Sequence, residues 1–282
     1  MDPITARKTW RTAEPIHGLV YFAPEADEAY AALGVPTPLS YFASRAAPMG
    51  AVSAEVVIAT FYNFYPDLVR RAIPWAWTVT TPGQLLAARL VGAGAALRRA
   101  LGDLAEGPAV AEAAELARRA ALAACERPEG RPLFAGHVSL DWPDEPLLVL
   151  WHAQSLLREF RGDGHIAAMA VEGVTGLEAL LIHGGTGEIP ASVLKATRAW
   201  PDEQWAAGED GLRSRGWLDA TGALTEAGRT HRKWVEDRTD LLAVPAYEAL
   251  GEDGCSRLRE LCRPMSRAVV GSGSLGFGTP PK

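Results

Sequence analysis

The chain has 282 residues, 48% of them hydrophobic, which is enough apolar sequence for one large core or two smaller ones. Its formal net charge of -6 excludes an overall basic field that would attract nucleic acid or anionic lipid. The first ten residues contain no apolar signal core, and no apolar run is long enough to span a bilayer. We therefore expect a cytoplasmic protein with no membrane partner.

The N-terminal segment carries a polar row within apolar sequence. Residues 5–14 are predicted to be helical, and Pro15 either kinks this helix or starts another. Glu14, His17 and Tyr21 follow at spacings of three and four, which places them on one helical face if the kink is mild. This row fits either the wall of a pocket or a buried histidine whose hydrogen bonds are satisfied, and the sequence leaves both interpretations open.

A lone cation and an aromatic cluster follow. Arg45 lies in the apolar stretch YFASRAAPMG, and a buried arginine needs a carboxylate partner, for which Glu14 and Glu25 are nearby in the sequence. Ser53 is a good N-cap for a helix that extends through Asn63, a polar group that itself needs a partner. The aromatic residues around it either wall a ligand pocket or form ordinary core: Phe61, Tyr62, Phe64, Tyr65, Trp75 and Trp77.

Several later helices are predicted from their start signals. Thr81 is an N-cap followed by Pro82 at the first helical position. Residues 108–125 form an alanine-rich amphipathic pattern. Thr175 and Glu178 make a capping box, and further helices are expected after residues 190, 200, 225 and 251.

The stretch from Leu147 to Ala170 is the most informative part of the sequence. It has the pattern of a buried apolar helix up to Leu157, and then charged and titratable residues arrive: Arg158, Glu159, Arg161, Asp163 and His165. Because buried charge is costly unless it is paired, this cluster either cross-links the core or builds a site. Gly162 and Gly164 flank Asp163, so we expect the helix to break or bend there, with Asp163 as a candidate N-cap for the next segment.

The charged cluster supports three interpretations. Arg158 and Arg161 suit a bound carboxylate or phosphate. Histidines at 17, 152 and 165, with Asp163 and Glu159, form a nitrogen and oxygen donor set suited to zinc, iron or manganese, although their spacing matches no metal motif. A salt-bridge cluster that joins two halves of the protein is the structural alternative. The sequence contains no nucleophile motif, phosphate loop or dinucleotide fingerprint, so it identifies no cofactor.

The segments LRSRGWLD and GALTEAG, within residues 212–228, resemble the recognition-helix end and the wing of MarR-type regulators. In those proteins LT-x-x-G closes the wing and starts the dimerisation helix. The resemblance covers residues 176–250, about a quarter of the chain, and implies a winged helix and, by analogy, a homodimer. The whole chain also resembles a family of actinobacterial winged-helix proteins that share EPIH, YFAPE, YFASRAAP and LREFRGDGH segments.

The resemblance does not by itself establish DNA binding. Residues 190–250 carry eight basic and ten acidic side chains, whereas a DNA-reading module is usually basic because phosphate neutralisation supplies most of the affinity. The predicted recognition helix, PDEQWAAGEDGLRSRG, holds four acids and two arginines. The sequence therefore disfavours DNA as a partner without excluding it, and the basic Arg229, Arg232 and Lys233 of the wing are the argument in its favour.

Together these patterns predict a mainly α-helical protein. We expect a helical domain at 1–140, a winged helix-turn-helix domain with a small β-hairpin wing and flanking helices at 141–270, and a flexible tail at 271–282. The favoured hypothesis is a regulator or sequestering protein that binds a small molecule between the two domains, through Tyr21, Arg45, Tyr62, Asn63, Arg158 and Arg161. The alternative is an enzyme that uses the same cleft, with acid–base groups or metal ligands drawn from His17, His165, Glu159 and Asp163.

Overall fold

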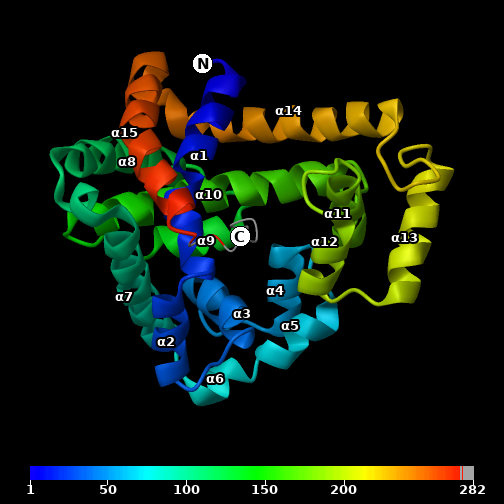
Figure 1. The fold of residues 1–282 in the computed structure, drawn as a ribbon, viewed down its shortest axis with the longest axis horizontal. Helices are drawn as coiled ribbons and strands as arrows, with labels where there is room; N and C mark the ends of the chain where they lie inside the picture. The colour runs from blue at the N-terminus through cyan, green and yellow to red at the C-terminus, as the bar shows by residue number, and fades with distance from the viewer. Residues whose placement is uncertain (274, 276–282) are drawn as a thin grey trace.

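The computed structural model describes residues 1–273 and 275 and consists almost entirely of helices (Figure 1). This confirms the predicted mainly α fold. The α-helices in chain order are α1 (Pro3–Gly18), α2 (Pro24–Ala32), α3 (Leu39–Ala46), α4 (Ala54–Phe61), α5 (Pro66–Ala72), α6 (Ala76–Val79), α7 (Pro82–Leu101), α8 (Pro108–Cys125), α9 (Pro132–Val138), α10 (Pro146–Val171), α11 (Gly176–Gly184), α12 (Ala191–Arg198), α13 (Asp202–Ser214), α14 (Glu226–Glu248) and α15 (Gly251–Gly271). Short 3-10 helices lie at Leu19–Tyr21, Ala47–Met49 and Gly102–Glu106.

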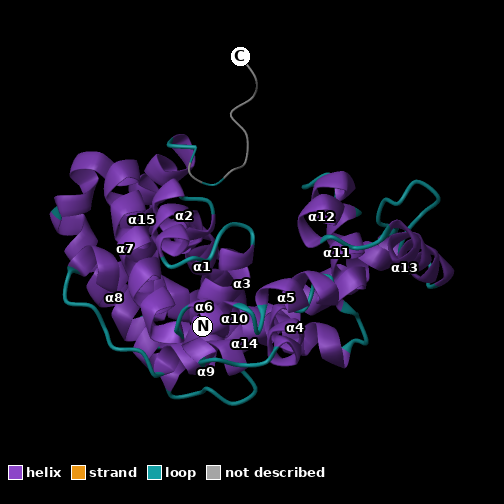
Figure 2. Cartoon of the chain, turned by 90° about the horizontal axis from the view of Figure 1, so that it is seen from below, coloured by secondary structure: helices purple, strands orange, loops and turns teal. Residues whose placement is uncertain are grey.

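The predicted β-hairpin wing is wrong. The described residues contain no β-strand, and the two extended segments are joined by a single antiparallel bridge between Leu218 and Leu224 (Figure 2). The ladder does not lengthen because the chain makes a tight turn at one end of it and enters α14 directly after Thr225 at the other. The backbone N–H of Leu224 donates to the carbonyl of Gly185 at the end of α11 (3.0 Å), and Asp219 closes a tight turn by accepting from the backbone N–H groups of Thr221 and Ala223.

Helix starts lie where the cap signals predicted them. The side chains of Ser53, Thr81, Thr175 and Thr225 each accept a hydrogen bond from a backbone N–H in the first turn of their helix. Both Thr81 and Thr175 complete a capping box with the residue three positions later. Pro15 lies inside α1, so it does not start a new helix.

Helix α10 runs unbroken for 26 residues, so the predicted break at Gly162 and Gly164 is wrong. A Cβ placed on Gly164 would lie 3.3 Å from the Cβ of Leu242 in α14. The glycine therefore lets α10 and α14 pack closely instead of breaking the helix. Within the described chain, no single helix has the length and apolar character to cross a membrane, and α10 with α11 meets that test only as a pair bent by 100°.

Two hydrophobic cores organise the molecule. The larger core gathers buried residues between 6 and 160 and between 246 and 269, and the smaller one lies between 168 and 235. Helices α10 and α14 run alongside each other and pass from one core to the other, so the α11–α13 unit stands beside a larger helical body (Figure 1). Whether 1–140 and 141–270 are separate domains stays a prediction, and residues 274 and 276–282 of the predicted tail lie outside the described residues.

Candidate functional site

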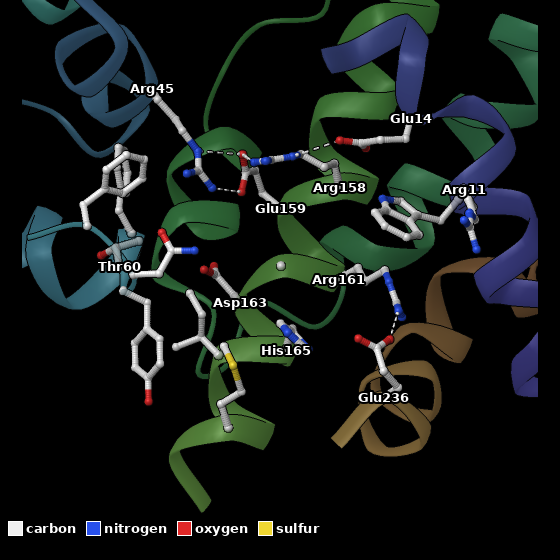
Figure 3. A pocket seen from close by; sticks show the side chains of 18 of the residues that line it. Arg11, Glu14, Arg45, Thr60, Arg158, Glu159, Arg161, Asp163, His165 and Glu236 are labelled. Atoms are coloured by element: carbon white, nitrogen blue, oxygen red, sulfur yellow. Dashed lines mark hydrogen bonds and ion pairs between the residues drawn. The ribbon is translucent and has the colours of Figure 1, made fainter. Parts of the chain in front are cut away.

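A cavity of about 550 Å³ lies between the helical body and α12, whose Arg198 lines it. Figure 3 shows side chains of its lining. Its walls include residues of α1, α3, α10, α12 and α14, and a second cavity of about 510 Å³ shares several of its lining residues. We call the larger cavity the arginine cleft because seven arginines line it: Arg7, Arg11, Arg45, Arg158, Arg161, Arg198 and Arg232. The structure brings eight of the ten predicted site residues to this cleft: Arg45, Tyr62, Asn63, Arg158, Glu159, Arg161, Asp163 and His165.

Glu159 is the centre of a buried ion-pair network in the cleft wall (Figure 3). Its carboxylate accepts from Arg45 Nη2 at 3.1 Å and from Arg158 Nη1 at 2.6 Å, and its side chain is 1% exposed. Burial alone would raise the pKa of Glu159, but the two arginines hold it well below its ordinary value. The partner of Arg45 is therefore Glu159, whereas Glu14 pairs with Arg158 and Glu25 with Arg99.

A second network joins α10 to α14 and α1. Arg161 Nη1 donates to Asp240 at 2.8 Å, and Arg161 Nη2 donates to Glu236 at 3.1 Å. Arg7 reaches the same buried Asp240 at 2.6 Å. Arg161 therefore has two carboxylate partners within the protein, which fits the salt-bridge interpretation of this part of the charged cluster.

Asp163 and His165 are also held by protein groups. The carboxylate of Asp163 accepts from the backbone N–H of Phe134 at 2.9 Å, so it caps α9 from a neighbouring helix and does not cap a segment of its own. Burial raises the pKa of Asp163 to about 6. His165 Nδ1 lies 2.8 Å from Thr239 Oγ1, and burial lowers the pKa of His165. A catalytic role for either residue stays a prediction.

His17 and Tyr21 do not line the arginine cleft but belong to a buried chain of hydrogen bonds. Ser155 donates its hydroxyl proton to the carbonyl of Trp151, so its oxygen accepts from His17 Nδ1 at 2.9 Å. His17 Nε2 then accepts from the Tyr21 hydroxyl at 3.2 Å, and the Tyr21 oxygen accepts from Arg89 at 2.9 Å. Burial holds the pKa of His17 well below its ordinary value. Of the two interpretations left open, the structure shows the satisfied buried histidine.

The structure does not bring His17 to the cleft that His165, Glu159 and Asp163 line, and a metal or catalytic role for these residues stays a prediction. Both ring nitrogens of His17 are already occupied by hydrogen bonds. Among residues 1–273 and 275, no three histidine, cysteine, aspartate or glutamate side chains are grouped closely enough to hold a metal ion.

Sequence reasoning missed Arg198, the last residue of α12. Its guanidinium carbon lies 4.6 Å from the centre of the Phe64 ring, and Nη1 donates to Thr197 at 2.9 Å. Its Nε is buried without a hydrogen-bond partner, and no described carboxylate lies within ion-pair distance of it. Burial lowers the pKa of Arg198. The only sequence signal was an arginine directly before Ala199-Trp200-Pro201, which is a helix-end pattern without functional meaning of its own.

The arginines of α13 are neutralised within the protein. Arg213 pairs with Glu209 at 3.0 Å and with Asp210 at 2.8 Å, both on its own helix. Arg215, directly after the helix, pairs with Glu178 of α11. At the N-terminal end of α13, which is the end that a recognition helix usually directs toward bases, Asp202 pairs with Lys195 of α12 at 2.6 Å, and Glu203 is exposed and makes no ion pair among the described residues.

Comparison with known proteins gives a match to a family of proteins. No curated protein and no solved structure matches it. The resemblances to MarR-type regulators and to actinobacterial winged-helix proteins are finer than the family match and stay predictions. A helix-turn-helix family matches residues 6–276, nearly the whole length, and the chain belongs to this helix-turn-helix family.

Proposed function

We propose that this helix-turn-helix protein is a ligand-responsive regulator or sequestering protein that binds a small organic anion in the arginine cleft. The observation that carries the proposal is Arg198, a half-buried cation in the cleft wall whose Nε is buried and which has no carboxylate partner among the described residues. Arg11 lines the same cleft and makes no ion pair within the described chain either. An unpaired buried cation is costly, and a bound anion would remove that cost.

The composition of the cleft supports an anion with an apolar body. Seven arginines face five carboxyl groups there. Each of these carboxyl groups already has a partner within the protein: Glu14, Glu159 and Glu236 pair with arginines of the cleft, Glu188 lies 3.9 Å from Arg232, and Asp163 accepts from the backbone N–H of Phe134. Guanidinium groups bind carboxylates and phosphates through paired hydrogen bonds. The aromatic rings of Phe61, Tyr62 and Phe64 provide an apolar wall, and the volume is that of an ordinary small-molecule site.

The position of Arg198 supports a response as well as binding. The end of α12 rests on the helical body, because the Arg198 carbonyl accepts from the backbone N–H of Tyr65 at 3.0 Å and Trp200 Nε1 donates to the Asn63 carbonyl at 2.9 Å. An anion held between Arg198 and Arg158 would contact α12 and α10 together. Its binding would therefore favour one spacing between the α11–α13 unit and the body over others.

Titration calorimetry with phenyl phosphate tests the proposal. We expect phenyl phosphate to bind the wild-type chain, phenol to bind at least tenfold more weakly, and Arg198→Gln to lose roughly tenfold or more in affinity for phenyl phosphate. Arg70→Gln is the matched control, because Arg70 pairs with Glu55 and Asp67 on the surface and does not line the cleft. Equal binding of phenol and phenyl phosphate, or unchanged affinity in Arg198→Gln, would contradict an anion site in this cleft.

A further inference from the structure

A separate cavity of about 340 Å³ lies within the helical body. It is bordered by α7, α9, α10 and the segment between α9 and α10, and it shares no lining residue with the arginine cleft. Leu86, Leu90 and Trp151 give it apolar walls, and Arg89, His137 and His152 provide its buried polar groups. Its composition is that of a small-molecule site, with an apolar lining and a few convergent polar side chains.

Arg89 is the unusual member of this lining. Its side chain is fully inside the body, with the residue 2% exposed, yet no carboxylate of the described chain lies within ion-pair distance of it. Nη1 donates to the Ser44 carbonyl at 3.2 Å and Nη2 to the Tyr21 hydroxyl at 2.9 Å, while Nε is buried with no partner. Buried arginines are ordinarily paired with an anion, because the cost of removing the charge from water is otherwise uncompensated.

Two neighbours in the lining also have a buried ring nitrogen that forms no hydrogen bond. Trp151 Nε1 and His152 Nε2 are buried without hydrogen-bond partners. The N–H groups of Arg89 Nε and Trp151 Nε1 can only donate, so what they lack is an acceptor. Water would satisfy the hydrogen bonds but would bring no negative charge to Arg89.

The histidines do not change the charge of the cavity near pH 7. Burial and then the nearby Arg89 lower the pKa of His137 to about 3 and that of His152 to about 4, so both rings are neutral. The one carboxylate in the lining, Asp141, is exposed in the segment between α9 and α10 and forms no ion pair with Arg89. The buried part of the lining therefore carries one positive charge that no carboxylate pairs, with the Tyr21 and Trp151 rings 5.4 and 5.5 Å from the Arg89 guanidinium carbon.

We infer that this cavity binds an organic carboxylate, with the carboxylate on Arg89 and the apolar body against Leu86, Leu90 and Trp151. The site is distinct from the arginine cleft and does not depend on the function proposed for that cleft. The exposed position of Asp141 places the opening of the cavity at the segment between α9 and α10.

Fluorine NMR titration with para-fluorobenzoate tests this inference on the full chain, and neutral para-fluorobenzamide serves as the isosteric comparison. We expect saturable binding of the benzoate, at least tenfold tighter than the amide, since a hydrogen bond to a charged group is the main difference between them. Arg89→Met should weaken benzoate binding by tenfold or more. Leu90→Trp should abolish it by filling the cavity, and Arg70→Gln, at a surface position outside both cavities, should leave it unchanged.

Three results would overturn the inference: equal affinity for benzoate and benzamide, benzoate binding that survives Leu90→Trp, or benzoate binding that is lost in Arg70→Gln. If Arg89→Met does not fold, the Leu90→Trp comparison still decides. Phenyl phosphate binding at the arginine cleft together with no benzoate binding would remove the inner site and leave the proposed function standing. The reverse result would remove the proposed function and support the inner site.

Discussion

Arg45 of α3 and Glu159 of α10 form a two-pronged ion pair although 114 positions separate them in the chain. The distances are 3.3 Å from Nε to Oε1 and 3.1 Å from Nη2 to Oε2. The Arg45 guanidinium carbon also lies 4.4 Å from the centre of the Phe61 ring. Because Glu159 binds Arg158 as well, one buried carboxylate fixes two of the arginines that shape the arginine cleft.

Glu159→Gln should therefore destabilise the fold strongly. The change removes the negative charge but leaves Arg45 and Arg158 in the wall, and breaking a buried pair in this way costs about 3–5 kcal/mol. Urea denaturation at pH 7 measures the loss. Glu55→Gln is the control, because Glu55 pairs with Arg70 at the surface with a side chain 66% exposed, where a pair contributes at most about 1 kcal/mol. Similar losses in both variants would show that Glu159 has no special role.

The neutral histidines of the inner cavity predict an acid-sensitive fold. The folded-state pKa values of His137 and His152, about 3 and about 4, lie below the ordinary value of 6.5, so the unfolded chain binds protons more readily. This contribution to stability is complete above pH 6.5 and is lost as the pH falls toward those values. Each histidine should contribute a slope of about 1.4 kcal/mol per pH unit in that window. In His152→Gln the slope of unfolding free energy between pH 6 and pH 5 should be smaller by that amount, and an unchanged slope would contradict the buried neutral state.

The contribution of Asp163 to the free energy of unfolding should depend on pH in the opposite direction to that of the two histidines. Its folded pKa of about 6 lies above the ordinary value of 3.8, so its contribution is complete below pH 3.8 and is lost as the pH rises through 6. Relative to wild type, Asp163→Asn should therefore gain about 2 kcal/mol in unfolding free energy between pH 4 and pH 7. The difference between the two proteins cancels the histidine effects that they share. A difference that does not vary with pH would show that Asp163 titrates normally in the folded state.

The starts of helices were predicted well because a capping interaction involves residues that are close together in the sequence. Thr81 and Thr175 accept hydrogen bonds from residues three positions away, so the sequence contains both partners. Gly164 was misread because glycine weakens an isolated helix, and only the packing of Leu242 from α14 shows why a small residue is needed. The wing was overpredicted because α14 begins directly after its N-cap Thr225, which leaves only the bridge between Leu218 and Leu224 before the helix.

The residue types in the sequence identified most residues of the candidate site, but they did not show which of these residues contact each other. A charged cluster in an apolar run identified Glu159 and its neighbours, because such charges require partners in any fold. The choice of partner depended on chain topology, and sequence proximity wrongly suggested Glu14 or Glu25 for Arg45. Arg198 was missed for the same reason, since its burial arises from the contact of α12 with the helical body.

Gly176, the first residue of α11, lies against the backbone of Tyr62, which directly follows α4. A Cβ at Gly176 would lie 1.9 Å from the carbonyl oxygen of Tyr62, so Gly176→Ala requires the backbone to move. We expect a loss of about 1–3 kcal/mol in unfolding free energy, together with weaker phenyl phosphate binding if the cleft depends on this contact. The matched control is Gly211→Ala in α13, where a Cβ would meet nothing within 4 Å and alanine should stabilise the helix by about 0.5–1 kcal/mol. Equal effects of the two variants would show that the approach at Gly176 is relaxed in solution.

The acidic surface of α13 leads to an expectation for DNA. Asp202, Glu203 and Asp210 are exposed there, and Arg213 is held by Glu209 and Asp210. In fluorescence anisotropy with a labelled duplex of mixed sequence, the chain should bind more weakly than the nonspecific affinities of about 10⁻⁴ to 10⁻⁶ M found for DNA-binding proteins at physiological salt.

Reversing charge on α13 tests whether these acids are the cause. The double change Glu203→Lys with Asp210→Lys should create measurable, salt-sensitive binding, because it adds two cations and releases Arg213 from one of its partners. Glu28→Lys with Glu106→Lys makes the same change in net charge on exposed positions of the helical body and should add much less. Tight, salt-dependent binding by the unaltered chain would instead assign DNA contact to the basic side chains Arg229, Arg232 and Lys233. The ligand response would then control DNA occupancy through α14, which carries those three residues and whose Arg232 also lines the arginine cleft.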